Sequence, residues 1–357
     1  MKVLMLSIDK KIFDDESDIK NRMLEYGKLF DELHIIVYTH RGFNNLKIAP
    51  NIFIYPTNSI GKLFYICDAT KLGKQIIHNS KFQIHNSIIT CQDPFETGFV
   101  GWTIARKFKI KLQLQVHTDF LSPYFVKNSI LNILRTTIAK FLLPKADCVR
   151  VVSKRIAESL KNIVQDSKIQ LLPIFIDIEK IRNVSITVDL RKKYPQFENI
   201  ILMISRLEKE KNIPLAISAM KDVVKKYPKT GLVIVGDGSK RKTLKSQDSI
   251  IFDGWQNKKT IYSYYKTADL LLVTSDYEGY GMAIIEALAS GLYVLSTDAG
   301  IAFEAGAQIT ERDSVALNIV KYIESGRKTG DLKNYPYENK QEYLERFKQS
   351  FICKKKK

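Results

Sequence analysis

Short apolar runs alternate with amphipathic stretches along almost the whole chain. Apolar runs of strand length that end in turn residues predict buried strands, and apolar residues recurring every three or four positions predict helices. The expected strands span residues 2–8, 33–38, 51–56, 87–91, 111–117, 148–152, 169–175, 200–205, 231–235, 250–252, 270–273 and 293–296. The expected helices span residues 18–30, 60–78, 94–108, 129–143, 154–163, 213–227, 258–267, 282–290, 315–325 and 341–351.

The order of these elements predicts an α/β protein with two parallel sheets, each covered by helices on both faces. We assign 1–172 to a first Rossmann-like domain, 173–183 to a linker and 184–335 to a second Rossmann-like domain. Residues 336–357 remain as a C-terminal helix that could pack back on the first domain. Ligands of such sheets bind beyond the carboxyl ends of the strands, so two facing domains would place the site in an interdomain cleft.

The charge balance narrows the class of partner. The chain of 357 residues has 56 Lys and Arg against 38 Asp and Glu, a formal net charge of +18. Such a balance suits phosphorylated substrates, nucleic acid or an anionic membrane, although lysines spread over solvated helix faces would also account for it. We expect no nucleic-acid partner, because the chain lacks a basic stripe interleaved with aromatic residues.

Four cysteines, Cys67, Cys91, Cys148 and Cys353, show neither Cys-x-x-Cys nor zinc-ligand spacing. We expect Cys91 and Cys148 to be reduced core residues of a cytoplasmic protein. The N-terminus does not resemble a signal peptide, and no run approaches the ~20 apolar residues of a transmembrane helix. The sequence therefore indicates a soluble or peripheral protein.

Four loops of the second domain follow predicted strands and should meet at one edge of its sheet. The first holds Arg206 and Lys211, two cations that suit a diphosphate. Two further loops contain Gly236 and Gly238, and a glycine before Trp255. Glycine lets the backbone come close to a base or a phosphate.

The fourth loop leads directly into a helix and holds the richest candidate chemistry. It contains Gly279, Tyr280 and Gly281, preceded by Glu278, and Glu286 follows eight positions after Glu278 in the helix. Unpaired N–H groups and the dipole at a helix N-terminus favour an anion. A carboxylate in the early turns can accept hydrogen bonds from two ribose hydroxyls. We therefore predict a sugar nucleotide here.

Four segments now carry a resemblance: SRLEKEKN (205–212), VIVGDGS (233–239), FDGW (252–255) and ADLLLVTSDYEGYGMAIIEALASGLYVLSTDAG (268–300). Together they make the second domain resemble the C-terminal domain of the family 4 retaining glycosyltransferases, which have the GT-B fold. The first domain resembles the acceptor-side domain of that family more loosely, through HTDF (117–120) and KADCVRVVS (145–153).

The resemblance implies a role for each charged candidate. Arg206 and Lys211 would bind the donor diphosphate and offset charge on the leaving group. Glu286 would bind the ribose, and Glu278 would face hydroxyls of the transferred sugar. His117, at a strand end of the first domain, would reach the sugar or the acceptor from across the cleft.

The remaining implied contacts come from backbone groups. The N–H groups around Gly279, Tyr280 and Gly281 would help to hold the sugar, and the backbone near Trp255 would lie by the nucleobase. Enzymes of this kind generally need no divalent metal, so we expect neither a metal nor another cofactor. Retention without an evident nucleophile indicates front-face substitution, in which the leaving phosphate accepts the proton of the acceptor.

The chain departs from the family pattern in two places. Many members have a glycine-rich turn after the first strand, where this chain has Ser7-Ile8-Asp9-Lys10-Lys11. A nearby cation could substitute for that turn, or the loop could serve the acceptor. After Gly300 the usual second glycine is Ile301, and we assign no catalytic role to Glu304.

Several alternatives remain open at this point. Another GT-B enzyme, such as a sugar-phosphate synthase, phosphorylase or epimerase, would share the donor motifs. A basic nucleotide- or nucleic-acid-binding protein and an inactive partner subunit are further alternatives. Asp93 and Glu96 could contact the acceptor, or helix capping at Pro94 could account for them. The donor base, the donor sugar, the acceptor, the linkage and the oligomeric state do not follow from the residues.

The expected helix over 129–143 mixes large apolar residues with Arg135 and Lys140. It could lie on an anionic membrane, as in lipid-acceptor enzymes of the family, or line the cleft or core. The terminal lysines 354–357 could add to membrane contact or remain solvated. A glycan or lipid-linked acceptor at the inner face of the cytoplasmic membrane is thus one expectation.

Overall fold

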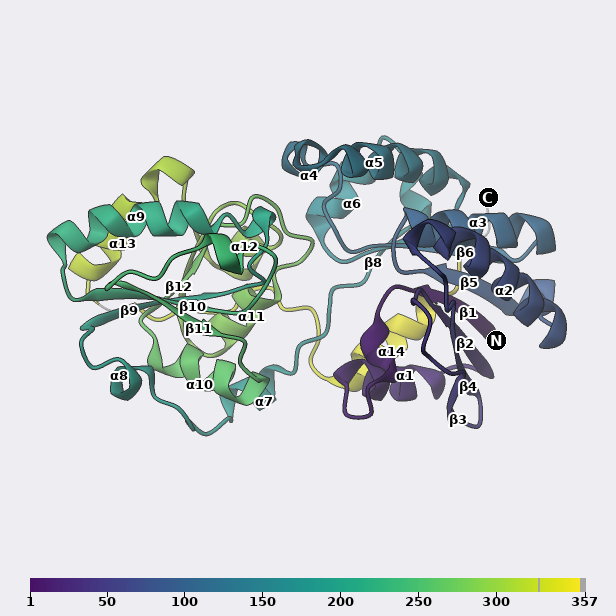
Figure 1. Cartoon of the computed structure of the whole chain (residues 1–357), viewed down its shortest axis with the longest axis horizontal. Helices are drawn as coiled ribbons and strands as arrows, with labels where there is room; N and C mark the ends of the chain where they lie inside the picture. Colours follow the sequence, from purple (N-terminus) through teal and green to yellow (C-terminus); the bar gives the residue numbers. More distant parts are fainter. Residues whose placement is uncertain (327, 354–357) are drawn as a thin grey trace. The chain divides into compact units, whose positions relative to one another are not determined.

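The computed structural model describes residues 1–326 and 328–353, and it divides the chain into two compact units (Figure 1). The N-terminal unit comprises Met1–Leu121, Ser129–Pro173 and the chain from Gln341 onward, and the C-terminal unit comprises Ser122–Asn128 and Ile174–Lys340. The terminal lysines 354–357, for which membrane contact was considered, lie outside the described residues.

The sheet of the N-terminal unit has the strand order β3-β4-β2-β1-β5-β6-β7-β8, and its neighbouring strands are parallel except for the β3–β4 pair. The apolar runs form its strands because both faces of a parallel sheet are covered. The strands are β1 (Lys2–Ser7), β2 (Glu32–Val37), β3 (Leu46–Ala49), β4 (Ile52–Pro56), β5 (Ser87–Cys91), β6 (Lys111–Val116), β7 (Cys148–Val151) and β8 (Ile169–Leu171).

The helices of this unit lie on both faces of the sheet (Figure 1). The α-helices are α1 (Asp18–Gly27), α2 (Tyr65–Asn79), α3 (Glu96–Phe108), α5 (Ile130–Leu142), α6 (Lys154–Leu160) and α14 (Lys340–Gln349). The 3-10 helices are η1 (Lys10–Phe13), η2 (Lys62–Phe64), η3 (Ile84–Asn86), η4 (Leu143–Lys145) and η5 (Asp166–Lys168).

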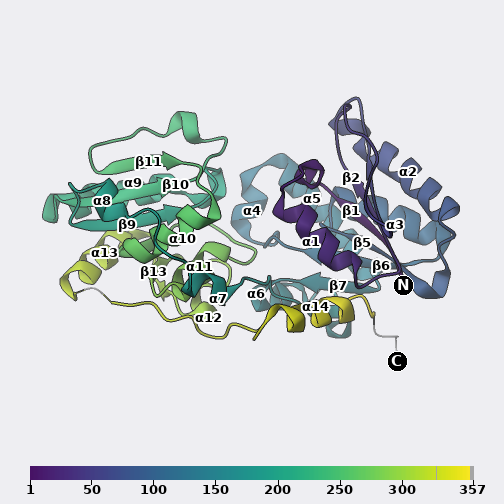
Figure 2. The same ribbon diagram turned by 90° about the horizontal axis from the view of Figure 1, so that it is seen from below.

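Helix α14 returns from the end of the chain to the core of the N-terminal unit and lies alongside β7 (Figure 2). The ring of Phe347 stacks on Tyr26, with 3.9 Å between the ring centroids, and joins the cluster formed by α1 and the sheet. The prediction that Cys148 is reduced was wrong, because α14 brings Cys353 to β7 and the two sulfurs form a disulfide. Cys91 is buried and free.

The C-terminal unit holds a second sheet with the order β11-β10-β9-β12-β13-β14, whose paired strands are parallel. Helices α9 and α13 cover one face, and α8, α10 and α11 lie on the other (Figure 1). Its strands are β9 (Asn199–Ile204), β10 (Thr230–Val235), β11 (Ile250–Gly254), β12 (Leu270–Val273), β13 (Tyr293–Ser296) and β14 (Gln308–Ile309).

The helices of the C-terminal unit are α4 (Pro123–Asn128), α7 (Ile178–Arg182), α8 (Leu190–Lys193), η6 (Lys209–Lys211), α9 (Ile213–Lys226), η7 (Arg241–Thr243), α10 (Lys258–Thr267), α11 (Met282–Ala289), α12 (Ala302–Ala305), η8 (Arg312–Ser314) and α13 (Val315–Glu324). Two of them differ from the expected division of the chain. Helix α4 comes from the first half of the sequence but packs with this unit. There the ring of Phe125 meets the ring of Tyr277 edge-on, with 5.7 Å between the ring centroids. The segment expected to be a linker contains α7, whose N-cap Asp177 accepts a hydrogen bond from Lys180 N.

Each sheet contains a point where the strand order reverses. In the C-terminal unit the chain leaves β9 toward β10 on one side and β12 lies on the other side, and in the N-terminal unit β1 has β2 and β5 as neighbours. Loops diverge at such points and leave a crevice at the carboxyl ends of the strands. Among the described residues, no helix is both long and apolar enough to cross a membrane.

Candidate active site

The reversal point of the C-terminal unit is spanned by an ion pair between two predicted site residues. Lys211 ends η6 after β9, and its Nζ pairs with Oε1 of Glu278 in the loop after β12. Both side chains are largely enclosed, and Ser275 Oγ also donates to Glu278 Oε1 at 2.8 Å. The pair therefore holds a cation and a carboxylate side by side where a ligand would enter.

Backbone and side-chain bonds tie the loop after β12 to η6. Thr274 Oγ1 donates to the carbonyl oxygens of Lys211 and Asn212 at 3.0 and 3.1 Å. The N–H of Asp276 donates to Glu210 O at 2.7 Å. Asp276 also accepts from Asn212 Nδ2 at 3.0 Å and pairs with Arg312 at 2.8 Å. These bonds fix the position of the Lys211–Glu278 pair.

Arg206 does not join this pair. Its side chain is 73% exposed, and its Nη2 lies 2.9 Å from Oε1 of Glu210. An exposed guanidinium with a single carboxylate partner can turn toward an incoming anion at little cost. The structure thus presents one enclosed cation, Lys211, and one exposed cation, Arg206, in the same loop.

Helix α11 begins where the glycine loop ends. Gly281 has φ +100°, a left-handed conformation that favours glycine, and the helix follows from Met282. The first N–H groups of a helix have no intrahelical acceptor, so the start of α11 is a favourable place for an anion. Tyr280 turns inward and is buried, and its carbonyl oxygen accepts from Ile301 N at 3.0 Å.

Glu286 lies one turn into α11 and is mostly enclosed. Tyr265 donates its hydroxyl to Oε2 of Glu286 at 3.1 Å. Burial raises the pKa of Glu286 to about 7, against the lowering effects of the Tyr265 hydroxyl and the Lys258 charge. A carboxyl with this pKa changes its charge near neutral pH, so its ability to accept two hydroxyls would depend on pH.

The loop after β10 packs against the loop after β9 through backbone. A Cβ on Gly236 would lie 2.0 Å from the carbonyl oxygen of Ser205, and one on Gly238 would lie 2.6 Å from that of Leu207. Gly236 has φ +135°, and its N–H donates to Gly254 O at 2.8 Å. These contacts explain both glycines through the close approach of loops, before any ligand is considered.

Trp255 follows β11 and is 71% exposed. The residue at the base of its loop, Asp253, is held by Lys193, by the Tyr194 hydroxyl at 2.5 Å and by the Tyr264 hydroxyl at 2.7 Å. Burial works to raise the pKa of Asp253, but these hydrogen bonds outweigh it and lower that pKa. Our sequence reasoning missed this network, since its members are spread over α8, α10 and β11.

His117 follows β6 in the N-terminal unit and is exposed to solvent. Its Nε2 lies 2.9 Å from Oε1 of Gln115. Desolvation by the surrounding atoms, followed by the charges of Arg150 and Arg22, lowers the pKa of His117 to about 3. The ring is therefore neutral at pH 7. Its Nε2–H donates to Gln115 Oε1, so Nδ1 is the ring atom that can accept a hydrogen bond from a ligand.

Two further candidates in the N-terminal unit have structural partners. Asp93 Oδ1 accepts from the N–H groups of Phe95 and Thr97 at 2.8 and 3.2 Å, which holds the start of α3. Glu96 pairs with Arg135 at 2.8 Å. In the loop after β1, Ser7 Oγ donates to Oε1 of Gln92 at 2.9 Å, so a side-chain bond occupies the place where the family has a glycine turn.

The comparisons with known proteins agree with the fold and with the motifs. Residues 189–307 match the family model of glycosyl transferases group 1, and residues 31–180 match that of glycosyltransferase family 4. The two matches together show that the chain belongs to glycosyltransferase family 4, whose members have the GT-B fold.

Among its relatives is the alpha-monoglucosyldiacylglycerol synthase of Streptococcus pneumoniae, which is 30% identical over 232 residues, covering 60% of this chain and 52% of that protein. The enzyme of the same name from Acholeplasma laidlawii is 24% identical over 252 residues, covering 65% of this chain and 60% of that protein. The chain thus matches little more than half of the length of these two relatives.

The solved structures share the fold. Sucrose-phosphate synthase from Thermosynechococcus elongatus superimposes with a TM-score of 0.72 at 18% identity, over 98% of this chain and 94% of that chain. The Anabaena protein HepE in complex with UDP and glucose gives a TM-score of 0.65 at 18% identity, over 92% and 91% of the two chains. At this identity the likeness shows the α/β fold of two Rossmann-like domains, as the sequence predicted.

Proposed function

We propose that the chain is a retaining glycosyltransferase that moves a sugar from a nucleotide-diphosphate sugar to an acceptor hydroxyl. The observation that carries the proposal is the Lys211–Glu278 pair, which spans the reversal point of the sheet beside the start of α11. Lys211 would take the diphosphate, with Arg206 turning in from the surface. Glu278 would then accept hydroxyls of the donor sugar, and Glu286 those of the ribose.

The reaction breaks the bond between the anomeric carbon and the diphosphate and forms a bond to the acceptor oxygen on the same face of the sugar. The proton of the acceptor hydroxyl passes to the leaving phosphate oxygen. Charge therefore grows on the phosphate, where the ammonium of Lys211, the guanidinium of Arg206 and the N–H groups at the start of α11 stabilise it. Because these groups offset that charge, we propose that no divalent metal is needed, and turnover should persist in excess EDTA.

Gly279, Tyr280 and Gly281 would hold the sugar through backbone N–H groups, and the backbone next to Trp255 would lie by the nucleobase. Gly236 and Gly238 would keep their loop close to the phosphates. For His117, we propose a contact with the transferred sugar or the acceptor, since Nδ1 of its neutral ring can accept a hydrogen bond from a hydroxyl. Retained activity in His117→Ala would remove that role.

The acceptor that we propose is a glycan or a lipid-linked molecule, handled at the inner face of the cytoplasmic membrane. This rests on relatives named as synthases of a glucosylated diacylglycerol and on the formal net charge of +18, which attracts an anionic surface. A second candidate is a sugar-phosphate synthase, because one structural neighbour is named sucrose-phosphate synthase. Product formed from a sugar phosphate but not from a lipid or glycan hydroxyl would favour that second candidate.

The first experiment is a thermal-shift screen over UDP-, GDP- and ADP-sugars. UDP-sugars come first, because HepE is described in complex with UDP and glucose. The expected result is stabilisation by one nucleotide class in the wild type, and its loss in Lys211→Ala and Glu286→Gln. Glu304→Gln is the matched control and should keep the shift. No stabilisation by any donor, or an equal shift in all four proteins, would contradict the site.

A further inference from the structure

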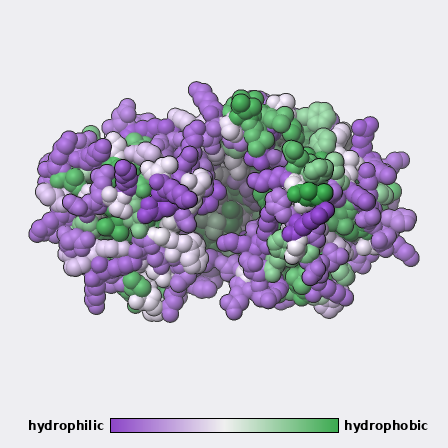
Figure 3. Space-filling model, in the orientation of Figure 1, coloured by the Kyte–Doolittle hydropathy of each residue, from purple (hydrophilic) through white to green (hydrophobic). Residues whose placement is uncertain are grey.

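Two places in the N-terminal unit reverse the usual pattern of burial. Helix α5 exposes large apolar side chains, among them Ile130 and Leu134, and Figure 3 shows hydrophobic residues gathered over it. The membrane contact considered for that helix would cover them. The second reversal lies inside the sheet, where Thr90 of β5 and Gln113 and Gln115 of β6 are buried. Buried hydroxyl and amide groups need hydrogen-bond partners, so this polar row needs an account of its own.

The register of the strands brings these polar side chains together. Thr90 lies opposite Gln113 in the β5–β6 pair, and Gln115 lies opposite Arg150 of β7, which is also buried. Side chains two positions apart on a strand point to the same face. Gln113, Gln115 and His117 therefore form one row that follows β6 and continues past its carboxyl end.

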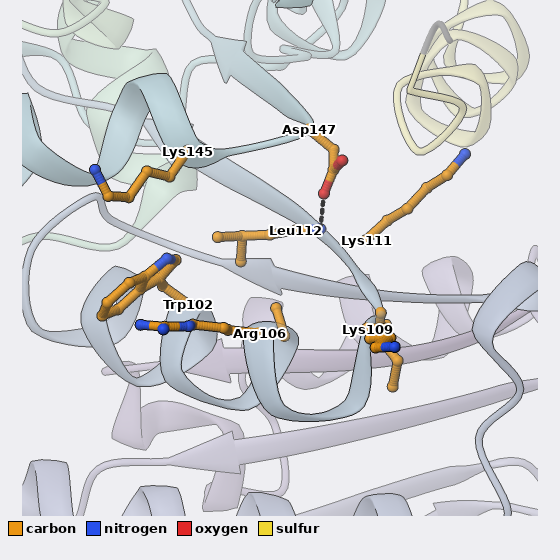
Figure 4. Close-up of a pocket in the computed structure, with 9 residues that line it drawn as sticks. Trp102, Arg106, Lys109, Lys111, Leu112, Lys145 and Asp147 are labelled. Carbon is orange, nitrogen blue, oxygen red and sulfur yellow. Dashed lines mark hydrogen bonds between the residues drawn. The ribbon is translucent and has the colours of Figure 1, made fainter. Parts of the chain in front are cut away.

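The amino end of β6 is held in this register by Asp147, which directly precedes β7. Its Oδ2 accepts from Leu112 N at 2.8 Å, and its N–H donates to Leu112 O at 2.9 Å. The first of these bonds is the dashed line in Figure 4, at the edge of a basic pocket lined from α3, β6 and η4. The two bonds keep Gln115 beside Arg150 further along the pair.

A chain of hydrogen bonds runs through the row, and its two ends fix the direction of every bond. At one end the guanidinium of Arg150, which can only donate, bonds to Gln115 Oε1. Gln115 Nε2 therefore donates to Thr90 Oγ1 at 2.7 Å, and the Thr90 hydroxyl donates to Gln113 Oε1 at 2.9 Å. Gln113 Nε2 then donates to the carbonyl oxygen of Ser350, directly after α14, which can only accept.

This direction leaves one arrangement for the ring of His117. Because Gln115 Oε1 is an acceptor, the ring nitrogen that lies 2.9 Å from it, Nε2, carries the proton. The lone pair of the neutral ring is then on Nδ1. Burial, followed by the charges of Arg150 and Arg22, lowers the pKa of His117 to about 3, so Nδ1 can accept a hydrogen bond but is a weak base.

We propose that Gln115 is a positioning residue for His117, and that the chain from Arg150 to Ser350 makes the ring an acceptor only toward its ligand. The ligand group at Nδ1 must then donate a proton into the hydrogen bond, as a sugar hydroxyl does and a phosphate or carboxylate oxygen does not. The reacting hydroxyl gives its proton to the leaving phosphate, so the hydroxyl at Nδ1 is one that does not react. The identity of this ligand rests on the proposed function, whereas the fixed ring does not.

The test is NMR of the histidine ring nitrogens in the full chain, which has five histidines. Long-range correlations between ring protons and nitrogens distinguish a proton on Nε2 from one on Nδ1, and the signals lost in His117→Gln assign the ring. Wild type at pH 7 should show a neutral His117 protonated on Nε2. A proton on Nδ1, an equal mixture of the two forms or an imidazolium would overturn the proposal.

Two variants break the chain at different places. Gln115→Leu removes the acceptor, and the charge of Arg150 then disfavours a proton on Nε2, so a large share of the rings should become protonated on Nδ1. Thr90→Val lets the Gln115 amide turn and should give a smaller change in the same direction, whereas Thr90→Ser keeps the hydroxyl and should restore the wild-type spectrum. The matched control is Gln170→Leu, which removes an amide bond to Ile352 O outside the chain.

Thermal unfolding shows which variants are folded before their spectra are compared. If Gln115→Leu does not fold, Thr90→Val and the wild-type spectrum carry the test. Wild-type spectra in the folded Gln115→Leu and Thr90→Val proteins would overturn the proposal. A change in Gln170→Leu as large as that in Thr90→Val would also overturn it, since the ring would then respond to any disturbance of the C-terminal segment.

Turnover connects the fixed ring to the reaction. With the donor identified by thermal shift, Gln115→Leu should lower kcat/KM by roughly fivefold, the value of about one neutral hydrogen bond. It should have no further effect in a His117→Ala background, and a loss that persists there would be structural and contradict the positioning role. The expected spectra in a protein that responds to no donor would contradict the proposed function and leave the positioning of His117 by Gln115 standing.

Discussion

The carboxyl edges of the two sheets are built differently. In the C-terminal unit, the loops after the three neighbouring strands β10, β9 and β12 are bonded to one another through backbone, as in the bonds from Leu207 N to Asp237 O and from Asp276 N to Glu210 O. In the N-terminal unit, the loop after β1 is held by the side-chain bond between Ser7 and Gln92, and His117 by its contact with Gln115. The first arrangement gives a preorganised edge, which suits the proposed donor site. The second can change with single substitutions, which suits an acceptor that varies.

The largest effect should come from the enclosed cation. Lys211→Ala removes the partner of Glu278 and the charge proposed to meet the diphosphate, so kcat/KM should fall by roughly 10²- to 10³-fold. Lys209→Ala, an exposed lysine of the same 3-10 helix, is the control. Initial rates with the donor identified by thermal shift measure both. Near wild-type turnover in Lys211→Ala would mean that the preorganised edge is not the donor site.

The N-terminal unit should depend on the end of the chain for stability. Phe347 is buried against Tyr26 and Phe351, so Phe347→Ala should cost about 3 kcal/mol in the free energy of unfolding, measured by denaturant titration. Ile352→Ala, at an exposed position, should cost far less. Similar midpoints for the two variants would show that α14 is not part of that core.

The close approach of backbone can be separated from conformational strain. Gly236 and Gly42 both have positive φ, but a Cβ at Gly236 would meet Ser205 O at 2.0 Å, whereas nothing lies within 4 Å of one at Gly42. Gly42→Ala should therefore lose about 1 kcal/mol from strain alone, and Gly236→Ala about 2 kcal/mol more. Equal losses in thermal unfolding would mean that the loops after β9 and β10 are less tightly joined than the contact indicates.

The smallest effect concerns pH. The pKa of Glu286 is raised from 4.5 to about 7, so between these values the unfolded chain has released a proton that the folded chain keeps. Stability must then fall as pH rises through this window, by about 1 to 2 kcal/mol once partial exposure is allowed for. Glu286→Gln should lack this loss, so its stability relative to wild type should increase from acid to neutral pH.

Donor affinity should follow the opposite course in the wild type. It should increase as Glu286 ionises near pH 7, because the carboxylate accepts hydroxyls better than the neutral acid. Titration calorimetry with the nucleotide at several pH values would show the trend. A pH-independent affinity would remove Glu286 from the ribose contact.

Much of the fold could be predicted from local patterns. Most predicted strands and helices are present within a few residues, because apolar runs and helical periodicity report directly which side chains are buried. Two short strands, β3 and β14, escaped prediction. They lie at sheet edges, where β3 has no fully buried residue and β14 has only two residues, so neither leaves a clear hydrophobic signal.

The site divides in the same way. Two parts of the candidate site could be predicted because each is contiguous in sequence. They are the loop with Arg206 and Lys211 and the stretch from Glu278 to Glu286. The network around Asp253 was not, because Lys193, Tyr194 and Tyr264 reach it from other elements. The sequence left acceptor contact and helix capping open for the segment around Asp93. In the structure, the Asp93 carboxylate accepts hydrogen bonds from backbone N–H groups at the start of α3.

By itself, the sequence determined the alternation of strands and helices, the strand-end loops and the family, since these depend on neighbours along the chain. The tertiary structure decided that Lys211 pairs with Glu278 while Arg206 stays at the surface, that Cys148 meets Cys353, and that α5 shows its apolar side to solvent. Each of these depends on which distant segments share the limited space around a side chain. The spacing of residues along the chain carries no information about which distant residue a side chain will contact.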